Sequence, residues 1–242
     1  MNNISDITAM ILVGGLGTRL QSVVSDRPKV LAEVCGKPFL AYLLDQVALT
    51  GIRKVILCSG YMSEKVEEAF GENYSGMEIC YSVEKTLLGT GGAVRLALSK
   101  LTSNYALILN GDSYIDADIK EYIRWYFAKR RLVALLLTGV DDSSRYGKVC
   151  IDEDERITAF NEKIAGSGPG LINAGMYLMD RLVIERIPAN EVFSLEKKLF
   201  PAINKSEIYG FCCNASFIDI GTPQSYSVAE NFFGKWSSEN DN

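Results

Sequence analysis

Short apolar runs alternate with amphipathic segments through the first half of the chain. The apolar runs have the length and composition of buried strands, and the segments between them repeat their apolar positions every three to four residues, as helices do. Strands that alternate with helices in this way predict βαβ units and a mostly parallel sheet. The predicted strands are 7–13, 55–59, 78–83, 105–109 and 132–140, and the predicted helices are 38–49, 64–70, 91–101 and 119–129.

The second half is less regular and favours antiparallel pieces and loops. An acidic turn separates two strand-like segments, 148–151 and 156–161, which predicts a hairpin. A glycine-rich stretch over 166–170 predicts a loop. Further strands are expected over 171–179 and, as a pair, over 206–212 and 217–220.

The end of the chain predicts a final helix. Thr222 is suited to its N-cap and Pro223 to its first turn, and the apolar pattern ends near Phe233. The polar tail over 234–242 is expected to fray. We find neither an internal repeat nor a linker, so we expect residues 1–242 to form one domain. The predicted fold is a Rossmann-like three-layer α/β/α arrangement with a mostly parallel mixed sheet.

The composition is that of a globular protein, with 48% hydrophobic and 23% charged residues among 242. Histidine is absent, which excludes every Ser-His or Cys-His catalytic pair and the commonest protein ligand of metals. Any chemistry must therefore use carboxylates, Lys, Arg, hydroxyls, thiols, backbone amides or a bound metal.

Charge and cysteine usage set the expected partners and compartment. The net charge of −5 disfavours a nucleic-acid-binding surface, and the basic cluster 129–131 is interpreted as a solvated helix end. The six cysteines include no CxxC pair, which indicates free thiols rather than a zinc or redox motif. No apolar run approaches the length of a membrane span. We expect a cytoplasmic protein without a membrane or nucleic-acid partner.

A glycine-rich turn follows the first predicted strand. It contains Gly14, Gly15 and Gly17, continues with Thr18 and Arg19, and is followed ten residues after Arg19 by Lys29. Glycines let backbone amides approach an anion, and the basic residues can neutralise phosphate charge. The turn lacks the Gly-Lys-Ser/Thr ending of a P-loop and the third glycine of a dinucleotide fingerprint.

Two aspartates each end an apolar strand just before or after a glycine. Asp112 follows Gly111 at the end of the 105–109 strand, and Asp219 precedes Gly221. Such residues at the carboxyl end of a sheet can share one hard divalent cation, for which oxygen ligands suffice. Asp112 alone could equally be a helix N-cap or an Asx-turn residue, and Asp219 could be a structural turn residue.

Taken in order, these motifs resemble those of the sugar-nucleotide pyrophosphorylases, the nucleotidyltransferases that join a nucleoside triphosphate to a sugar 1-phosphate. The resemblance extends from about residue 7 to residue 229 and includes the segments 110–112, 145–147, 160–163 and 173–175. It implies a nucleotide-binding half over about 7–140 and a sugar-phosphate-binding half over about 141–233.

The resemblance also implies roles for individual residues. Arg19 and Lys29 would neutralise the triphosphate, and Asp112 and Asp219 would hold Mg²⁺ between the two substrates. The residues implied in nucleotide binding are Leu12, Gly14, Gly15, Gly17, Thr18, Glu84, Gly89, Thr90 and Gly111, and those implied in sugar-phosphate binding are Gly147, Glu162, Lys163 and Asn173.

Within the family, the stretches 84–93 and 170–175 are most similar to the guanylyltransferases that act on D-glycero-α-D-manno-heptose 1-phosphate. Glu84 gives this similarity a physical basis, because a carboxylate can accept both N1–H and the exocyclic amine of guanine. The substrates implied are therefore GTP and this heptose 1-phosphate, in a bacterial surface-glycan pathway. Glu84 could instead be a surface carboxylate paired with Lys85.

Several alternatives stay open. Within the reaction class they are mannose 1-phosphate with GTP, or glucose 1-phosphate with UTP or dTTP. A non-catalytic nucleotide-sugar sensor would be expected to lack Arg19, Lys29 or the two aspartates, all of which are present. A dehydrogenase is disfavoured by the missing third glycine. The sequence does not decide whether the chain forms a homo-oligomer, nor whether Trp125 and Tyr126 lie in an interface or in the core.

Overall fold

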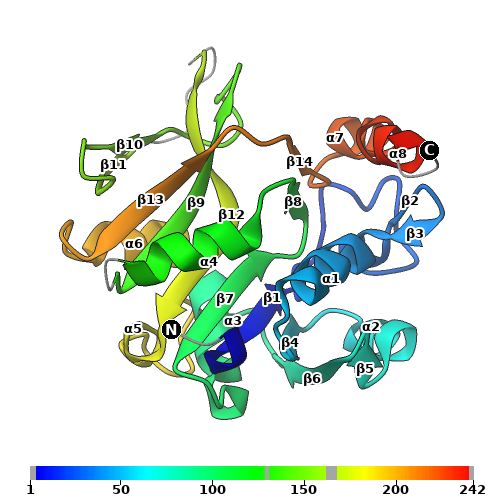
Figure 1. Ribbon diagram of the computed structural model, residues 1–242. Coiled ribbons are helices and arrows are strands. Elements are labelled where there is room, and N and C mark those ends of the chain that lie inside the picture. Colours follow the sequence, from blue (N-terminus) through cyan, green and yellow to red (C-terminus); the bar gives the residue numbers. More distant parts are fainter. Residues whose placement is uncertain (1–3, 129–130, 162–167, 240–242) are drawn as a thin grey trace.

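A computed structural model describes residues 4–128, 131–161 and 168–239. Its centre is a mixed, mostly parallel eight-stranded sheet (Figure 1). Strands β12 and β5 run antiparallel to their neighbours, and the remaining pairs are parallel. In spatial order the strands are β13 (Ile208–Cys213), β9 (Val133–Val140), β12 (Gly170–Asp180), β7 (Tyr105–Asn110), β1 (Ile7–Leu12), β4 (Lys54–Ser59), β6 (Met77–Val83) and β5 (Asn73–Tyr74).

Helices cover both faces of the sheet, which gives the predicted three layers. Successive side chains of each strand point to opposite faces, so one strand supplies two cores. In β1, Ile7, Ala9 and Ile11 pack into one core, whereas Met10 packs into the other. The helices are α1 (Phe39–Thr50), α2 (Ser63–Phe70), α3 (Gly89–Ala97), α4 (Ile119–Ala128), α5 (Arg181–Glu185), α6 (Phe200–Ala202), α7 (Pro223–Ser227) and α8 (Ala229–Glu239).

Smaller pieces attach to this framework. The predicted hairpin is present as β10 (Val149–Ile151) and β11 (Ile157–Phe160). Two further antiparallel pairs are β2 (Glu33–Val34) with β3 (Lys37–Pro38), and β8 (Ser113–Ile115) with β14 (Phe217–Asp219). The single-turn elements are η1 (Ile4–Asp6), η2 (Lys29–Leu31), η3 (Leu98–Lys100) and the π-helical turn η4 (Leu195–Leu199).

The end of the chain departs from the prediction in two respects. β13 and β14 do not pair with each other, because β13 extends the main sheet beside β9 while β14 pairs with β8. The final helix begins as predicted, with Thr222 as N-cap and Pro223 in the first turn. It breaks at Val228 and continues as α8 to Glu239, beyond the predicted end near Phe233.

In the basic cluster 129–131 after α4, the prediction of a solvated helix end is wrong for Arg131. Arg131 is buried, its guanidinium lies 3.6 Å from the centre of the Trp125 ring, and it pairs with Glu155 at 2.9 Å. Stacking and ion pairing therefore outweigh solvation at this position. Lys129 and Arg130 lie outside the described residues. Tyr126 is a core residue and Trp125 packs against the core.

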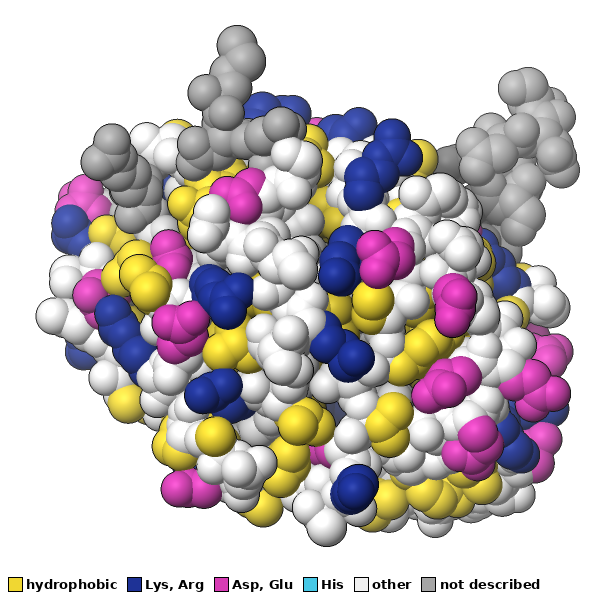
Figure 2. All heavy atoms as spheres, turned by 90° about the horizontal axis from the view of Figure 1, so that it is seen from below, with side chains coloured by type: hydrophobic (Ala, Val, Ile, Leu, Met, Phe, Trp, Pro, Cys, Tyr) yellow, Lys and Arg dark blue, Asp and Glu magenta, His cyan; other side chains and the backbone are white. Residues whose placement is uncertain are grey.

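The cysteines and one face of the surface can be described directly. All six cysteines are free. The face seen from below carries Lys and Arg intermixed with Asp and Glu and shows no stripe of one sign (Figure 2). Among the residues that the structure describes, no helix is both long enough and apolar enough to cross a membrane.

Candidate active site

The main cavity lies where the parallel strands β1, β4, β6 and β7 end. Because these strands are in parallel register, Leu12 lies beside Cys58 of β4 and Asn110 of β7, and the loops that follow converge. The cavity has a volume of about 470 Å³. It is lined by Leu12, Val13, Gly14, Gly15, Leu16, Gly17, Thr18, Lys29, Val30, Cys58, Glu84, Leu87, Gly89, Thr90, Ala93, Asn110, Gly111 and Asp112.

The cavity therefore brings together every residue that the sequence implied in nucleotide binding, together with Lys29 and Asp112. Leu12 through Thr18 come from β1 and the turn after it, Glu84 from the end of β6, and Gly89 and Thr90 from the first turn of α3. These segments are distant in sequence, and only the parallel sheet places them side by side.

Glycine is required at two points of this arrangement. A Cβ on Gly111 would lie 2.4 Å from the carbonyl oxygen of Leu12, so only glycine lets the strand end approach β1 this closely. Gly17 has a φ of +62°, and a Cβ there would lie 3.1 Å from the Cβ of Lys29. The glycine turn thus lies directly against the segment that carries Lys29.

Lys29 and Asp112 form an ion pair on the cavity wall. The Lys29 Nζ lies 2.5 Å from the Asp112 Oδ2, and the side chains are 15% and 30% exposed. Pro28, in an extended conformation, precedes the turn η2 that holds Lys29. A partly buried cation and a carboxylate at one position can bind a phosphate oxygen and a divalent cation respectively.

Glu84 lies on the opposite side of the glycine turn. A Cβ on Gly14 would lie 2.8 Å from the Glu84 Oε1, and one on Gly60 would lie 2.8 Å from the Glu84 Cγ, so the side chain rests against two glycines. The Leu88 N–H donates to its Oε2 at 2.9 Å. Burial raises the pKa of Glu84, and this hydrogen bond acts in the opposite direction. Glu84 thus lines the cavity, with its carboxylate held between the glycine turn and the Leu88 N–H.

Arg19 does not line the cavity. It is exposed, and its Nη2 lies 3.4 Å from the position that a Cβ on Gly221 would occupy. Its guanidinium is thus close to the turn that follows Asp219 rather than to the glycines that precede it in sequence. Lys29 thus lines the cavity and Arg19 does not, although both were expected to act on the triphosphate.

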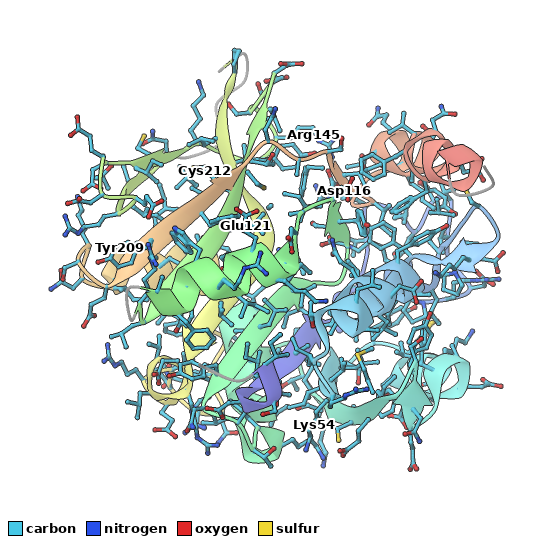
Figure 3. All side chains as sticks on the ribbon, in the orientation of Figure 1. Lys54, Asp116, Glu121, Arg145, Tyr209 and Cys212 are labelled. Atoms are coloured by element: carbon cyan, nitrogen blue, oxygen red, sulfur yellow. The ribbon has the colours of Figure 1, made fainter. Side chains whose placement is uncertain are left out.

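Asp219 is held by four groups of the protein. Arg145 Nη2 contacts its Oδ1 and Oδ2 at 3.2 and 3.0 Å, the Tyr146 hydroxyl donates to Oδ2 at 2.5 Å, and the Gly221 N–H donates to Oδ1 at 2.8 Å. The fourth group is the Ser225 hydroxyl, which donates to Oδ1 at 3.3 Å. Figure 3 shows Arg145 above β14 and beside α7. Burial raises the pKa of Tyr146, and the charge of Asp219 raises it further.

The two aspartates lie on adjacent segments. Asp219 pairs with Ser113 across β14 and β8, and the Ile220 N–H donates to the carbonyl oxygen of Asp112 at 2.9 Å. No group of three or more Asp, Glu, Cys or His side chains that could hold a metal occurs in the part of the chain that the structure describes. Two carboxylates fit Mg²⁺, which is commonly held by one or two carboxylates together with substrate phosphates and water.

The residues implied in sugar-phosphate binding are only partly described. Asn173 lies next to a bulge in β12, where the register with β9 shifts between Asn173 and Tyr177 and Gly175 has a φ of +76°. Its Nδ2 donates to the Tyr177 hydroxyl, and its Oδ1 accepts from the Gly175 N–H, both at 2.9 Å. Gly147 has a φ of +78° in the turn after Tyr146. Glu162 and Lys163 lie outside the described residues.

Sequence reasoning missed several residues of the site. Gly60 and Asn110 were not singled out as site residues, yet Gly60 makes room for Glu84 and Asn110 lines the cavity. The exposed apolar side chains Leu16 and Leu87 also line it. Gly60 follows a predicted strand, which is the signal that could have found it. Leu16 and Leu87 carry no comparable signal.

The chain is similar in sequence to known nucleotidyltransferases. The model of the nucleotidyl transferase family matches residues 8–235. The chain is 40% identical to D-glycero-alpha-D-manno-heptose 1-phosphate guanylyltransferase of Aneurinibacillus thermoaerophilus, over 92% of this chain and 96% of that protein. It is 37% identical to mannose-1-phosphate guanylyltransferase of Mycobacterium tuberculosis, over 91% of this chain and 62% of that protein.

A solved structure extends the comparison to three dimensions. The crystal structure of HddC from Yersinia pseudotuberculosis complexed with GMP-PN superposes with a TM-score of 0.83 and 32% sequence identity. The match covers 93% of this chain and 99% of that one. The similarity thus extends over the strands and loops that form the cavity as well as over the β9–β12–β13 side of the sheet.

Proposed function

The chain belongs to the nucleotidyl transferase family, and from this premise we propose that it transfers GMP from GTP to D-glycero-α-D-manno-heptose 1-phosphate. The products are GDP-heptose and pyrophosphate. The observation that carries the choice of nucleotide is the Glu84 carboxylate, which faces a cavity built from the glycine turn. The choice of sugar is supported by the 40% identity to the heptose 1-phosphate guanylyltransferase.

The proposed reaction needs no histidine. An oxygen of the sugar 1-phosphate attacks the α-phosphorus of GTP, a new P–O bond forms, and the bond to the β-phosphate oxygen breaks as pyrophosphate leaves with the electron pair. The second pKa of a phosphate monoester is about 6, so the nucleophile is largely dianionic at neutral pH and needs no general base. Catalysis then depends on in-line positioning and on neutralisation of charge.

The residues of the cavity have distinct proposed roles. Lys29 contacts the α-phosphate and the charge that develops on pyrophosphate, while the backbone of the glycine turn positions the triphosphate. Arg19 binds the β- and γ-phosphates from the side of Gly221, which requires its side chain to reach toward the turn when GTP is bound. Leu16 and Leu87 provide apolar contacts at the edge of the cavity.

Glu84 reads the base in this proposal. Guanine presents N1–H and an amine side by side, and a carboxylate accepts both in a charge-assisted pair. Uracil and thymine present one N–H between two carbonyl groups, to which a carboxylate is poorly matched. The Leu88 N–H orients the carboxylate through Oε2.

Asp112 and Asp219 are proposed to hold Mg²⁺. When bound, the ion would neutralise phosphate charge between the two substrates. Asp219 would hold the ion beside or in place of Arg145, which contacts both of its carboxylate oxygens in this structure. Asn173, Glu162 and the Gly147 backbone are proposed to bind sugar hydroxyls, and Lys163 the sugar phosphate.

The test is pyrophosphate release in the presence of Mg²⁺. GTP, ATP, CTP, UTP and dTTP are each combined with D-glycero-α-D-manno-heptose 1-phosphate, mannose 1-phosphate and glucose 1-phosphate. We expect release with GTP and the heptose phosphate. Equal or faster release with mannose 1-phosphate would overturn the choice of sugar, and preference for UTP or dTTP would overturn the role of Glu84. Absence of release with every pair would favour a nucleotide-sugar sensor.

The proposed product suggests a biological setting. GDP-heptose is an activated sugar, so the enzyme would supply a glycosyltransferase that builds a bacterial surface glycan, such as a lipopolysaccharide, a capsule or an S-layer glycan. Such a role places the enzyme in the cytoplasm, where GTP is available. Gel filtration coupled to light scattering would establish whether it acts as a homo-oligomer.

A further inference from the structure

A chain of hydrogen bonds connects the nucleotide cavity to the strand that carries Asn173. The Thr90 hydroxyl, on the cavity wall, donates to Glu196 Oε2 at 2.7 Å. The Tyr177 hydroxyl donates to Glu196 Oε1 at 3.1 Å and accepts from Asn173 Nδ2 at 2.9 Å. Glu196 therefore uses one oxygen toward each end of the chain of hydrogen bonds, and does not itself line the cavity.

The surroundings of Glu196 fix its position. It lies in η4, whose N-cap Ser194 donates from its hydroxyl to Glu196 Oε2 at 2.8 Å. The Leu195 N–H donates to the Thr90 hydroxyl at 2.9 Å. The Phe193 carbonyl oxygen accepts from the N–H groups of Gly91 and Gly92 at 2.8 and 3.1 Å, so η4 and the first turn of α3 are joined by backbone as well. Single π-helical turns often occur at functional sites.

The other end of the chain of hydrogen bonds is equally constrained. Tyr177 is fully buried, and its ring packs edge-on against Phe200 with centroids 4.9 Å apart. Burial and the nearby Glu196 charge hold the pKa of Tyr177 well above its usual range, so its hydroxyl stays protonated and donates. Asn173 then has its amide orientation set from both sides, by Tyr177 and by the Gly175 N–H.

From these contacts we propose that Glu196 is a positioning residue that couples the two substrate subsites. Glu196 holds Thr90 against the nucleotide and, through Tyr177, orients the Asn173 side chain toward the sugar phosphate. Binding in one subsite therefore changes the affinity of the other. The assignment of the two subsites rests on the proposed function, whereas the connection itself rests only on the contacts. Coupling between two sites is reciprocal, which makes the proposal testable from either end.

The test measures binding and turnover in variants of the full chain. Glu196→Ala is expected to weaken the binding of both substrates, because Thr90 and Tyr177 both lose their hydrogen-bond acceptor. The Kd for GTP and the KM for the sugar 1-phosphate should each rise by about 10-fold. Glu196→Gln keeps the length and one acceptor oxygen, and we expect about a 3-fold effect on each. Lys197→Gln, an exposed change in the same turn, should leave both constants unchanged.

Coupling is distinguished from a structural role by changing a residue in one subsite and measuring the other substrate. Thr90→Val should raise the KM for the sugar 1-phosphate, and Asn173→Ala should raise the Kd for GTP, each by about 3-fold. In the Glu196→Ala background both cross-effects should disappear. The proposal is overturned if Thr90→Val and Asn173→Ala keep these cross-effects in the Glu196→Ala background. It is also overturned if Glu196→Ala lowers the melting temperature but leaves the Kd for GTP and the KM for the sugar 1-phosphate unchanged, because Glu196 would then have a purely structural role.

GTP binding can be measured without turnover, so the coupling and the proposed function can fail separately. If wild-type protein releases no pyrophosphate with any substrate pair, the proposed function fails, while calorimetry with GTP still judges the coupling. In that case Asn173→Ala must weaken GTP binding in the wild-type background and leave it unchanged in the Glu196→Ala background. Equal GTP affinity of wild type and Asn173→Ala would reject the coupling whatever the activity.

Discussion

The proposed nucleotide side and the proposed sugar side of the site are built in different ways. On the nucleotide side, the ends of β1, β4, β6 and β7 lie in parallel register, and the loops after them form one cavity. On the sugar side, Asn173 depends on a bulge in an antiparallel strand, and Asp219 lies on the short strand β14 outside the main sheet. The first arrangement follows from a general property of parallel sheets, whereas the second depends on individual contacts.

The charges differ in the same way. Lys29 and Asp112 pair within the cavity and are 15% and 30% exposed. Asp219 is 12% exposed but its partner Arg145 is 46% exposed, so one member of that pair remains in water. A partly buried pair is screened less by salt than a pair with an exposed member. We therefore expect substitutions on the nucleotide side to have larger effects than those around Arg145.

The largest expected effect is at the Lys29–Asp112 pair. Lys29→Ala and Asp112→Ala should each lower kcat by at least ~100-fold, the scale of one electrostatic contact made in the transition state. The measurement is pyrophosphate release at saturating substrates. Lys100→Ala removes an exposed lysine at the opposite end of the sheet and serves as the matched control. Near-normal turnover of either variant would remove that residue from the proposed mechanism.

A smaller but more selective effect is expected at Glu84. Glu84→Gln preserves the side-chain length and the acceptor for the Leu88 N–H, but it can no longer accept from both donors of guanine. We expect kcat/KM for GTP to fall about 10- to 100-fold while that for UTP stays level or rises. Glu68→Gln, on the exposed side of α2, is the control for the loss of one charge. An unchanged GTP-to-UTP ratio contradicts base recognition by Glu84.

The difference between parallel strand ends and individual tertiary contacts explains how much of the fold and of the site the sequence could predict. Apolar runs located the strands of the main sheet, and a parallel sheet places their carboxyl ends together, so the glycine turn and Asp112 could be grouped beforehand, whereas Glu84 was assigned only through the family resemblance. The partners of Asp219 could not, because Arg145 and Tyr146 are 74 and 73 residues away in sequence and reach it only through tertiary packing. Neither position carries a periodic signal of that contact.

The wrong predictions have local physical causes. A basic residue after a helix is expected in solvent, but the Trp125 ring and Glu155 together provide a buried position for the Arg131 guanidinium. The apolar pattern predicted a helix end near Phe233, whereas α8 continues to Glu239. At Arg131, a pattern local in sequence was overruled by a neighbouring aromatic ring and by a carboxylate 24 residues away.

Close backbone approach on the nucleotide side predicts a stability effect. A Cβ on Gly111 would lie 2.4 Å from the Leu12 carbonyl oxygen, and backbone cannot move aside as a side chain can. Gly111→Ala should therefore lower the free energy of unfolding by about 1–3 kcal/mol, the usual cost of overpacking. Gly139→Ala in β9 is the control, since nothing lies within 4 Å of its Cβ position. Equal melting temperatures for the two variants would show that the strand ends can separate.

The smallest effect is expected at Arg145, and its sign decides what this residue does. If Arg145 only occupies Asp219 until the metal binds, Arg145→Ala removes a competitor of Mg²⁺, and the Mg²⁺ concentration for half-maximal rate should fall. An ion pair with an exposed member contributes about 0.2–1 kcal/mol, so the shift should not exceed about 5-fold. Ser225→Ala, which removes a weaker contact to Asp219, should shift it less. A higher Mg²⁺ requirement would instead mean that Arg145 binds substrate phosphate once it has left Asp219, and the sugar side would then resemble the nucleotide side in using a cation for catalysis.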